Sequence, residues 1–145
     1  MEPFDVLVVD DEVDFVNTLV KRLNLRDANA HGATSGLEAL RFMDQKPVDV
    51  VVLDVKMPDM GGIEVLREIR SRHPLVEVIM LTGHASLEVA IEGMEAGAFD
   101  YLMKPVSMDD LLYKLQDAYK KKTIHSEKIR RMVETERPSG RPSED

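Results

Sequence analysis

Residues 50–58 read Val-Val-Val-Leu-Asp-Val-Lys-Met-Pro, and they decide the fold because they join an apolar run to a carboxylate. Four consecutive apolar residues without polar alternation are typical of a strand that is buried on both faces of a parallel sheet. Asp54 follows that run directly, and a second run, residues 6–9, ends in the acidic triplet 10–12. The two runs therefore predict two buried strands with carboxylates at their carboxyl ends.

Two further apolar runs end in polar residues of other kinds. Residues 79–81 are followed by Thr82, and residues 101–103 are followed by Lys104 and Pro105. In an open parallel sheet the carboxyl ends of the strands share one edge, where ligands of such sheets bind. That edge would hold carboxylates, one hydroxyl and one ammonium group, which suits a hard cation and a phosphoryl group.

Segments of helical period separate these runs and carry their own start and stop signals. The positions with serine caps, first-turn acids, glycines or a breaking proline are Ser35, Glu38, Gly61, Gly62, Pro74, Ser86, Gly97, Ser107, Asp109 and Asp110. Residues 27–33 have poor strand propensity, and we place a fifth strand there because of the gap it must fill. The alternation predicts an α/β fold, a doubly wound (βα)5 with a five-stranded parallel sheet.

The composition limits the class of protein. A length of 145 residues suits one domain with a short extension, and a net charge of -8 argues against general nucleic-acid binding. The chain has no cysteine, which excludes disulfides, and no apolar stretch of membrane-spanning length. Residues 1–3 lead straight into a strand without the pattern of a signal peptide. We expect a cytoplasmic protein that contacts neither membrane nor nucleic acid directly.

The last predicted helix, from Ser107, carries a heptad-like apolar stripe with two polar interruptions. Its positions are Leu111, Leu115, Ala118, Lys122, His125, Ile129 and Met132. A helix that packs on the sheet and then continues into solvent explains the stripe, and so does a dimerising or signalling helix. We favour the first interpretation and predict one domain over residues 1–122, with a helical extension and disordered tail over residues 123–145.

The strand ends together indicate phosphoryl chemistry. Asp10, Asp11 and Asp54 would repel one another unless a cation intervenes, and Mg²⁺ prefers oxygen ligands of this kind. A carboxylate can also act as a nucleophile and form an acyl phosphate. Lys104 could pair with one phosphoryl oxygen and the Thr82 hydroxyl with another. Each residue alone also fits a helix cap, a loop or a strand end, so the argument rests on the set.

The set resembles the receiver domain of bacterial two-component response regulators, over about residues 4 to 121. The matching motifs are Asp10-Asp11, Asp54 with Met57-Pro58 and Gly62, Thr82-Gly83, Tyr101 and Lys104-Pro105. The resemblance implies a flavodoxin-like strand order 2-1-3-4-5. Residues 81–84 and 96–101 are most similar to receivers of the nitrogen-regulation type, which often carry an output domain after a linker helix.

The resemblance also implies roles for single residues. Asp54 would accept a phosphoryl group from a histidine kinase, a phosphotransfer protein or a small phosphodonor. Mg²⁺ would bind Asp11, Asp54 and the backbone carbonyl of Lys56, with Asp10 acting mainly through water. Thr82 and Lys104 would contact the phosphoryl group. The remaining implied features are the aromatic switch Tyr101, a cis Lys104-Pro105 peptide, and a surface that changes on phosphorylation, formed by the helix from Ser86, the strand from Phe99 and the helix from Ser107.

Other functions remain open at this point. A receiver-shaped interaction module that works without phosphorylation is the main alternative, although Asp54 and its partners argue against it. A phosphatase of the haloacid dehalogenase class would need Asp-x-Asp, and position 56 is Lys. A flavin-binding protein would need a phosphate loop where residues 10–12 are acidic. A receiver would catalyse its own phosphorylation and dephosphorylation without being a metabolic enzyme, and it could form a homodimer through the implied surface or the last helix.

Overall fold

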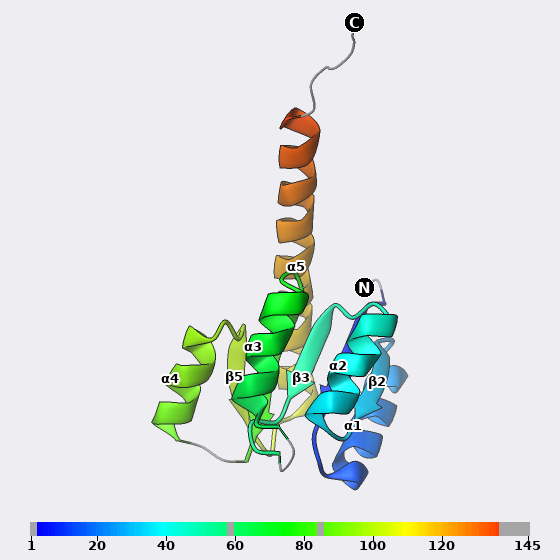
Figure 1. The fold of residues 1–145 in the computed structure, drawn as a ribbon. Coiled ribbons are helices and arrows are strands. Elements are labelled where there is room, and N and C mark those ends of the chain that lie inside the picture. Colours follow the sequence, from blue (N-terminus) through cyan, green and yellow to red (C-terminus); the bar gives the residue numbers. More distant parts are fainter. Residues whose placement is uncertain (1–2, 58–59, 84–85, 137–145) are drawn as a thin grey trace, which may run out of the picture.

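The computed structural model describes residues 3–57, 60–83 and 86–136, which form five strands alternating with five helices (Figure 1). Their order confirms the (βα)5 pattern. The elements are β1 Asp5–Val9, α1 Val13–Leu25, β2 Asn29–Ala33, α2 Gly36–Gln45, β3 Val50–Leu53, α3 Gly62–Arg72, β4 Glu77–Thr82, α4 Leu87–Glu95, β5 Asp100–Met103 and α5 Met108–Glu136.

All neighbouring strands are parallel, and their order is β2-β1-β3-β4-β5, as the resemblance implied. The apolar runs of β3 and β4 are buried along their whole length because helices cover both faces of the sheet. Val9 pairs with Leu53, and Thr82 pairs with Met103. This register places the polar residues that follow the strands at one edge.

Side chains of the strands alternate between two hydrophobic clusters, one on each face of the sheet. Leu7, Val51 and Met80 pack with α2 and α3, whereas Val8, Val52 and Leu81 pack with α1 and α5. Figure 1 shows α2 and α3 on the near face and α1 and α5 on the far face. The fold is therefore doubly wound, as predicted.

The weak second strand exists and lies at the edge of the sheet. Its small residues have a packing reason, because a Cβ on Gly32 would lie 2.4 Å from the Val16 Cγ1 atom of α1. The side chain of Asn24 also binds the strand backbone, since its Oδ1 accepts from the Ala30 N–H at 2.7 Å and its Nδ2 donates to the Ala30 carbonyl at 3.3 Å. The close packing of α1 and the hydrogen bonds of the Asn24 side chain therefore stabilise a strand whose own residues have low strand propensity.

The helix signals read from the sequence are confirmed. The Oγ atoms of Ser35, Ser86 and Ser107 each accept a backbone N–H three residues later, at 3.1 Å. Glu38 departs from the standard capping box, because it accepts from the Thr34 N–H at 2.6 Å instead of the Ser35 N–H. Gly97 follows α4 at φ 104°, a conformation that favours glycine.

Helix α5 is one continuous element across the predicted domain boundary at residue 122. Leu111, Leu115 and Ala118 are buried against the sheet. Further along, Ile129 and Met132 are exposed, and Figure 1 shows this part of α5 extending beyond the rest of the fold. Helix α5 thus continues to Glu136, the division into domain and extension stays a prediction, and the predicted tail from residue 137 lies outside the described residues. No helix in the described segments is long and apolar enough to cross a membrane.

Candidate functional site

The sheet backbone holds the predicted site residues at one edge. The Asp54 N–H donates to the Val9 carbonyl at 2.9 Å, and the Lys104 N–H donates to the Thr82 carbonyl at 2.9 Å. Each bond continues the strand ladder by one residue, so the polar side chains start from fixed positions on adjacent strands. The parallel register thus brings together residues that lie up to 94 positions apart in the sequence.

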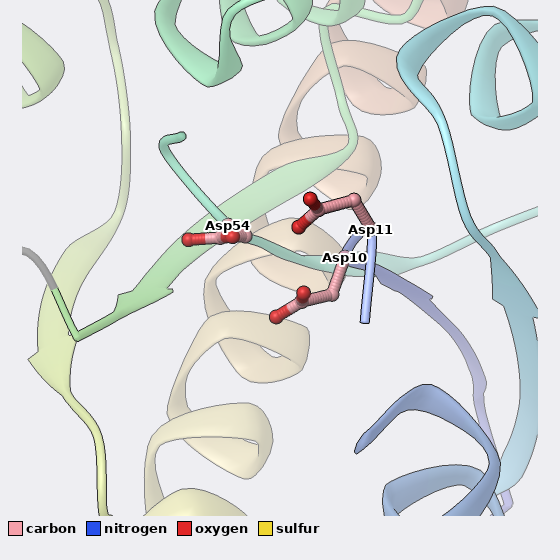
Figure 2. A group of neighbouring side chains, drawn as sticks. All are labelled: Asp10, Asp11 and Asp54. Carbon is pink, nitrogen blue, oxygen red and sulfur yellow. The ribbon is translucent and has the colours of Figure 1, made fainter. Parts of the chain in front are cut away.

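Three carboxylates gather at this edge, two from the end of β1 and one from the end of β3 (Figure 2). Asp10, Asp11 and Asp54 each place one carboxylate oxygen within 4.8 Å of the others. Asp10 and Asp54 are buried, whereas Asp11 is exposed. This donor set fits Mg²⁺, which takes carboxylate oxygens and retains water on its open side.

The environment of Asp54 disfavours its charged form. Burial raises the pKa of Asp54 above its usual range, and the negative charge of Asp10 adds to that effect. A hydrogen bond with the Thr82 side chain, the charge of Lys104 and the Lys56 N–H oppose the rise in pKa without cancelling it. A cation bound at the cluster would favour the ionised carboxylate, which is the form that can attack phosphorus.

Lys104 is the one lysine in ionic contact with the carboxylate cluster in the described part of the chain. Its Nζ lies 2.6 Å from Asp10 Oδ2 and 3.3 Å from Glu12 Oε1. It also lies 4.1 Å from the centre of the Phe15 ring. Burial lowers the pKa of Lys104, but the hydrogen bond and charge of Asp10, helped by Asp54 and Glu12, outweigh burial and raise it. Lys104 is therefore charged at neutral pH.

The cluster opens into a cavity of about 510 Å³, and Asp54 is part of its lining. The cavity is lined by Asp11, Glu12, Asp54, Lys56, Met57, Gly83 and Lys104. The Lys56 N–H points to Asp54 Oδ1 at 3.5 Å, the outer limit of a hydrogen bond. A metal contact of the Lys56 carbonyl stays a prediction.

Gly62 lets α3 begin directly beneath the site. Its N–H donates to the Val55 carbonyl at 2.7 Å, and a Cβ at this position would lie 2.3 Å from the Asp54 carbonyl oxygen. A larger residue would push α3 away from the loop that carries Asp54. The glycine of the predicted motif therefore shapes the loop after β3.

The structure brings Asp10, Asp11, Asp54, Thr82 and Lys104 together as the sequence predicted. The Lys104-Pro105 peptide is cis, as the resemblance implied. Tyr101 lies next to Met80 on the neighbouring strand and is half-buried against the cluster under α2 and α3, and its switching role stays a prediction. Pro58 and His84, which the resemblance also used, lie outside the described residues.

Two residues at the site were missed by the sequence reasoning. The sequence pattern places Glu12 in an acidic cluster without a contact of its own, and it indicates no role for Phe15. Phe15 follows Glu12 by three residues, the spacing that places two side chains on the same side of a helix. That spacing was the available signal, but it does not say that Lys104 from β5 lies opposite.

A family model described as "Response regulator receiver domain" matches residues 6–116, well over half of the chain. The chain belongs to this family. Receiver domains are typically phosphorylated and generally depend on Mg²⁺, which agrees with the aspartate cluster. This match also confirms the fold and family that the residue motifs predicted.

Three similar proteins show which response regulators this receiver domain resembles. It is 37% identical over 117 residues to the transcriptional regulatory protein ZraR of Klebsiella oxytoca, covering 81% of this chain and 26% of that protein. A receiver domain structure from Methanospirillum hungatei has a TM-score of 0.81 at 30% identity, covering 86% of this chain and 99% of that one. NtrX from Brucella abortus has a TM-score of 0.80 at 29% identity, covering 86% of this chain and 28% of that one.

The likeness to NtrX and ZraR agrees with the predicted nitrogen-regulation type of receiver. The chain spans about a quarter of the length of the curated relatives it matches. Activities of those whole proteins therefore do not transfer to this chain as findings.

Proposed function

We propose that this protein is a phosphorylation-activated signalling switch that accepts a phosphoryl group on Asp54. The observation that supports it best is the arrangement around that carboxylate. Asp10 and Asp11 offer carboxylate oxygens that suit a metal ion, Lys104 and Thr82 offer a positive charge and a hydroxyl, and Asp54 lines a cavity. Few other functions need a buried nucleophilic carboxylate between a metal site and a lysine.

In the proposed reaction an Asp54 carboxylate oxygen attacks the phosphorus of a phosphohistidine or a small phosphodonor. The new O–P bond forms as the N–P or O–P bond of the donor breaks, and the leaving atom keeps the electron pair. Asp11, Asp54 and the Lys56 carbonyl would hold Mg²⁺, with Asp10 acting mainly through water, and the ion would supply positive charge for the phosphoryl oxygens. Lys104 and the Thr82 hydroxyl contact the remaining oxygens. Attack by water on the phosphorus later restores Asp54 and releases inorganic phosphate.

Phosphorylation adds charge and acceptor oxygens beside Thr82. These groups shift the equilibrium between two conformations only if they interact more favourably with one of them. We place the responding surface on α4, β5 and α5, with Tyr101 as the switching side chain. Exposed apolar residues on these elements support the proposal, because a partner or a second copy could cover them. They are Leu87, Ile91, Met94, Met103 and Tyr113.

A sensor histidine kinase or a phosphotransfer protein is the proposed phosphodonor in the cell. A homodimer through the α4, β5 and α5 surface, or through the projecting part of α5, stays a prediction, as do a cytoplasmic location and the absence of direct nucleic-acid contact. The alternative function is an interaction module that works without phosphorylation. The complete set of Asp11, Asp54, Thr82 and Lys104 argues against it.

The test is to incubate the purified chain with Mg²⁺ and phosphoramidate and to record its intact mass beside Asp54→Asn. We expect a phosphoryl-sized gain in the wild type and none in the variant, with both proteins equally folded by circular dichroism. No gain in the wild type would support the phosphorylation-independent module. Gain in both proteins would mean that Asp54 is not the sole acceptor. Elution volume with and without phosphoramidate would then test dimerisation.

A further inference from the structure

The Lys104 ammonium contacts other groups than the one that it would contact on a phosphorylated Asp54. Its ion pairs in the described segments are with Asp10, at 2.6 Å, and with Glu12, at 3.3 Å. No ion pair joins it to Asp54 there, although the two residues flank the same cavity. A phosphoryl group on Asp54 would therefore have to attract a lysine that already has partners.

Glu12 is placed for this contact by its own backbone. Its N–H donates to Asp10 Oδ1 at 2.9 Å, which fixes it beside the aspartate that also binds Lys104. Glu12 is the N-cap residue of α1, yet its side chain accepts no hydrogen bond from the helix. The carboxylate that could have capped the helix contacts Lys104 instead.

Phe15 completes the surroundings of the ammonium from the first turn of α1. The Lys104 Nζ lies 4.1 Å from the ring centre, well inside the range of a cation–π contact. The ring packs against the cluster beneath α1 and α5, which holds it in place. Glu12 and Phe15 thus contact the same charge from one face of one helix.

We infer that Glu12 and Phe15 form a resting site for the Lys104 ammonium that competes with the phosphoryl group on Asp54. The inference rests on the proposed function, in which Lys104 contacts that group. Contacts that stabilise Lys104 only before transfer must be broken on the way to the transition state, so they slow the transfer. Glu12 and Phe15 are positioning residues, because they act through Lys104.

The first test measures the rate of phosphorylation by phosphoramidate at saturating Mg²⁺. The ion pair with the exposed Glu12 and the single cation–π contact with the half-buried Phe15 are weak interactions, so we expect Glu12→Gln and Phe15→Leu each to speed phosphorylation by about two- to fivefold. Glutamine keeps the shape of the side chain, and leucine keeps an apolar side chain in the cluster. Glu12→Gln should have no such effect in a Lys104→Gln background, because that background lacks the ammonium through which Glu12 acts.

Loss of a negative charge could also speed the reaction by reducing repulsion of the anionic phosphodonor. Asp14→Asn is the matched control, because Asp14 is exposed in the first turn of α1 and makes no hydrogen bond or ion pair in the described structure. We expect Asp14→Asn to leave the rate unchanged. Long-range repulsion would also be screened by salt, whereas the direct contact would be screened less.

The second test observes Lys104 directly in the unphosphorylated protein with a chelator present. The ¹⁵N resonance of its ammonium is assigned by its loss in Lys104→Arg. We expect faster hydrogen exchange of this ammonium in Glu12→Gln, and loss of the ring-current shift of the Lys104 side chain in Phe15→Leu. A merely structural role of either residue would leave the Lys104 signals unchanged.

The outcomes separate the two proposals. A wild type that gains no phosphoryl mass contradicts the proposed function and the competition together. A phosphorylated wild type whose variants are no faster, or whose Asp14→Asn control is equally fast, overturns the competition alone. Faster Glu12→Gln and Phe15→Leu variants with altered Lys104 signals would establish it.

Discussion

The strands of the sheet begin at one edge, the amino edge, and end at the other, the carboxyl edge. The two edges differ in how positive charge balances their carboxylates. At the amino edge three acidic residues each have a lysine of α5 as an ionic partner, and the pairs are Asp49–Lys122 at 2.6 Å, Glu77–Lys121 at 3.7 Å and Asp100–Lys114 at 2.5 Å. At the carboxyl edge three aspartates gather, and Lys104 forms an ion pair with Asp10 and none with the other two in the described chain.

This difference separates a structural edge from a functional one. The amino edge uses opposite charges to hold α5 on the sheet before it extends beyond the fold. The carboxyl edge leaves negative charge unbalanced, and burial of two of its carboxylates makes that arrangement costly without a cation. Unbalanced buried charge is a mark of a binding or catalytic site, because a purely structural cluster gains from being neutral.

The largest effect should separate two lysines, one at each edge. We expect Lys104→Ala to slow phosphorylation by phosphoramidate by about 100-fold, since it removes a charge aimed at the developing phosphoryl charge. Lys122→Ala breaks the pair with Asp49 and should leave the rate within twofold of the wild type. Intact mass followed over time measures both rates. Equal slowing by the two substitutions would contradict the division between the edges.

Metal binding should stabilise the carboxyl edge alone. Mg²⁺ at about 100 times its dissociation constant should raise the free energy of unfolding of the wild type by about 2.7 kcal/mol. Asp11→Asn should lose most of that gain, whereas Asp49→Asn at the amino edge should keep it. Urea unfolding with Mg²⁺ or a chelator gives the comparison. A full gain in Asp11→Asn would exclude the aspartate cluster as the metal site.

The amino edge should matter for stability. Asp49 accepts the Asp5 N–H at 2.8 Å and the Lys122 ammonium at 2.6 Å, and it is largely buried. Losing hydrogen bonds to a charged group costs about 2 kcal/mol, so Asp49→Ala should lower the free energy of unfolding by about that amount. Urea unfolding measures the change, and phosphorylation under native conditions should persist. An unchanged unfolding midpoint would show that the ion pairs of this edge contribute nothing.

The smallest effect concerns the pH dependence of stability without metal. The pKa of Asp54 is raised above its usual 3.8, so the folded state holds a proton that the unfolded state has released between those two pKa values. Stability therefore falls as pH rises through that window. Asp54→Asn should be more stable than the wild type at neutral pH, and the difference should vanish below the unfolded pKa. Urea unfolding across pH in chelator checks it, and a difference that grows on acidification would reverse the sign.

Sequence reasoning predicted the fold and most of the site because both depend on order along the chain. The apolar run before Asp54 and the runs that end in Thr82 and Lys104 were sufficient to predict a parallel sheet with polar residues at one edge. The strand at Asn29–Ala33 had to be inferred from a gap, since its stability comes from Asn24 and the close approach of α1. Such contacts leave no periodic signal.

The sequence by itself determined the alternation of elements, the helix caps and the chemical types at the four strand ends, because those follow from local pattern. Only the tertiary structure decided which charged side chains form ion pairs with one another. Lys104 lies 92 positions from Glu12, and the register of the sheet together with the packing of α1 brings them within 3.3 Å. The packing of α5 likewise gave three acids of the amino edge a lysine each, whereas one lysine serves the three aspartates of the carboxyl edge in the described chain, because charge balance depends on distances in space.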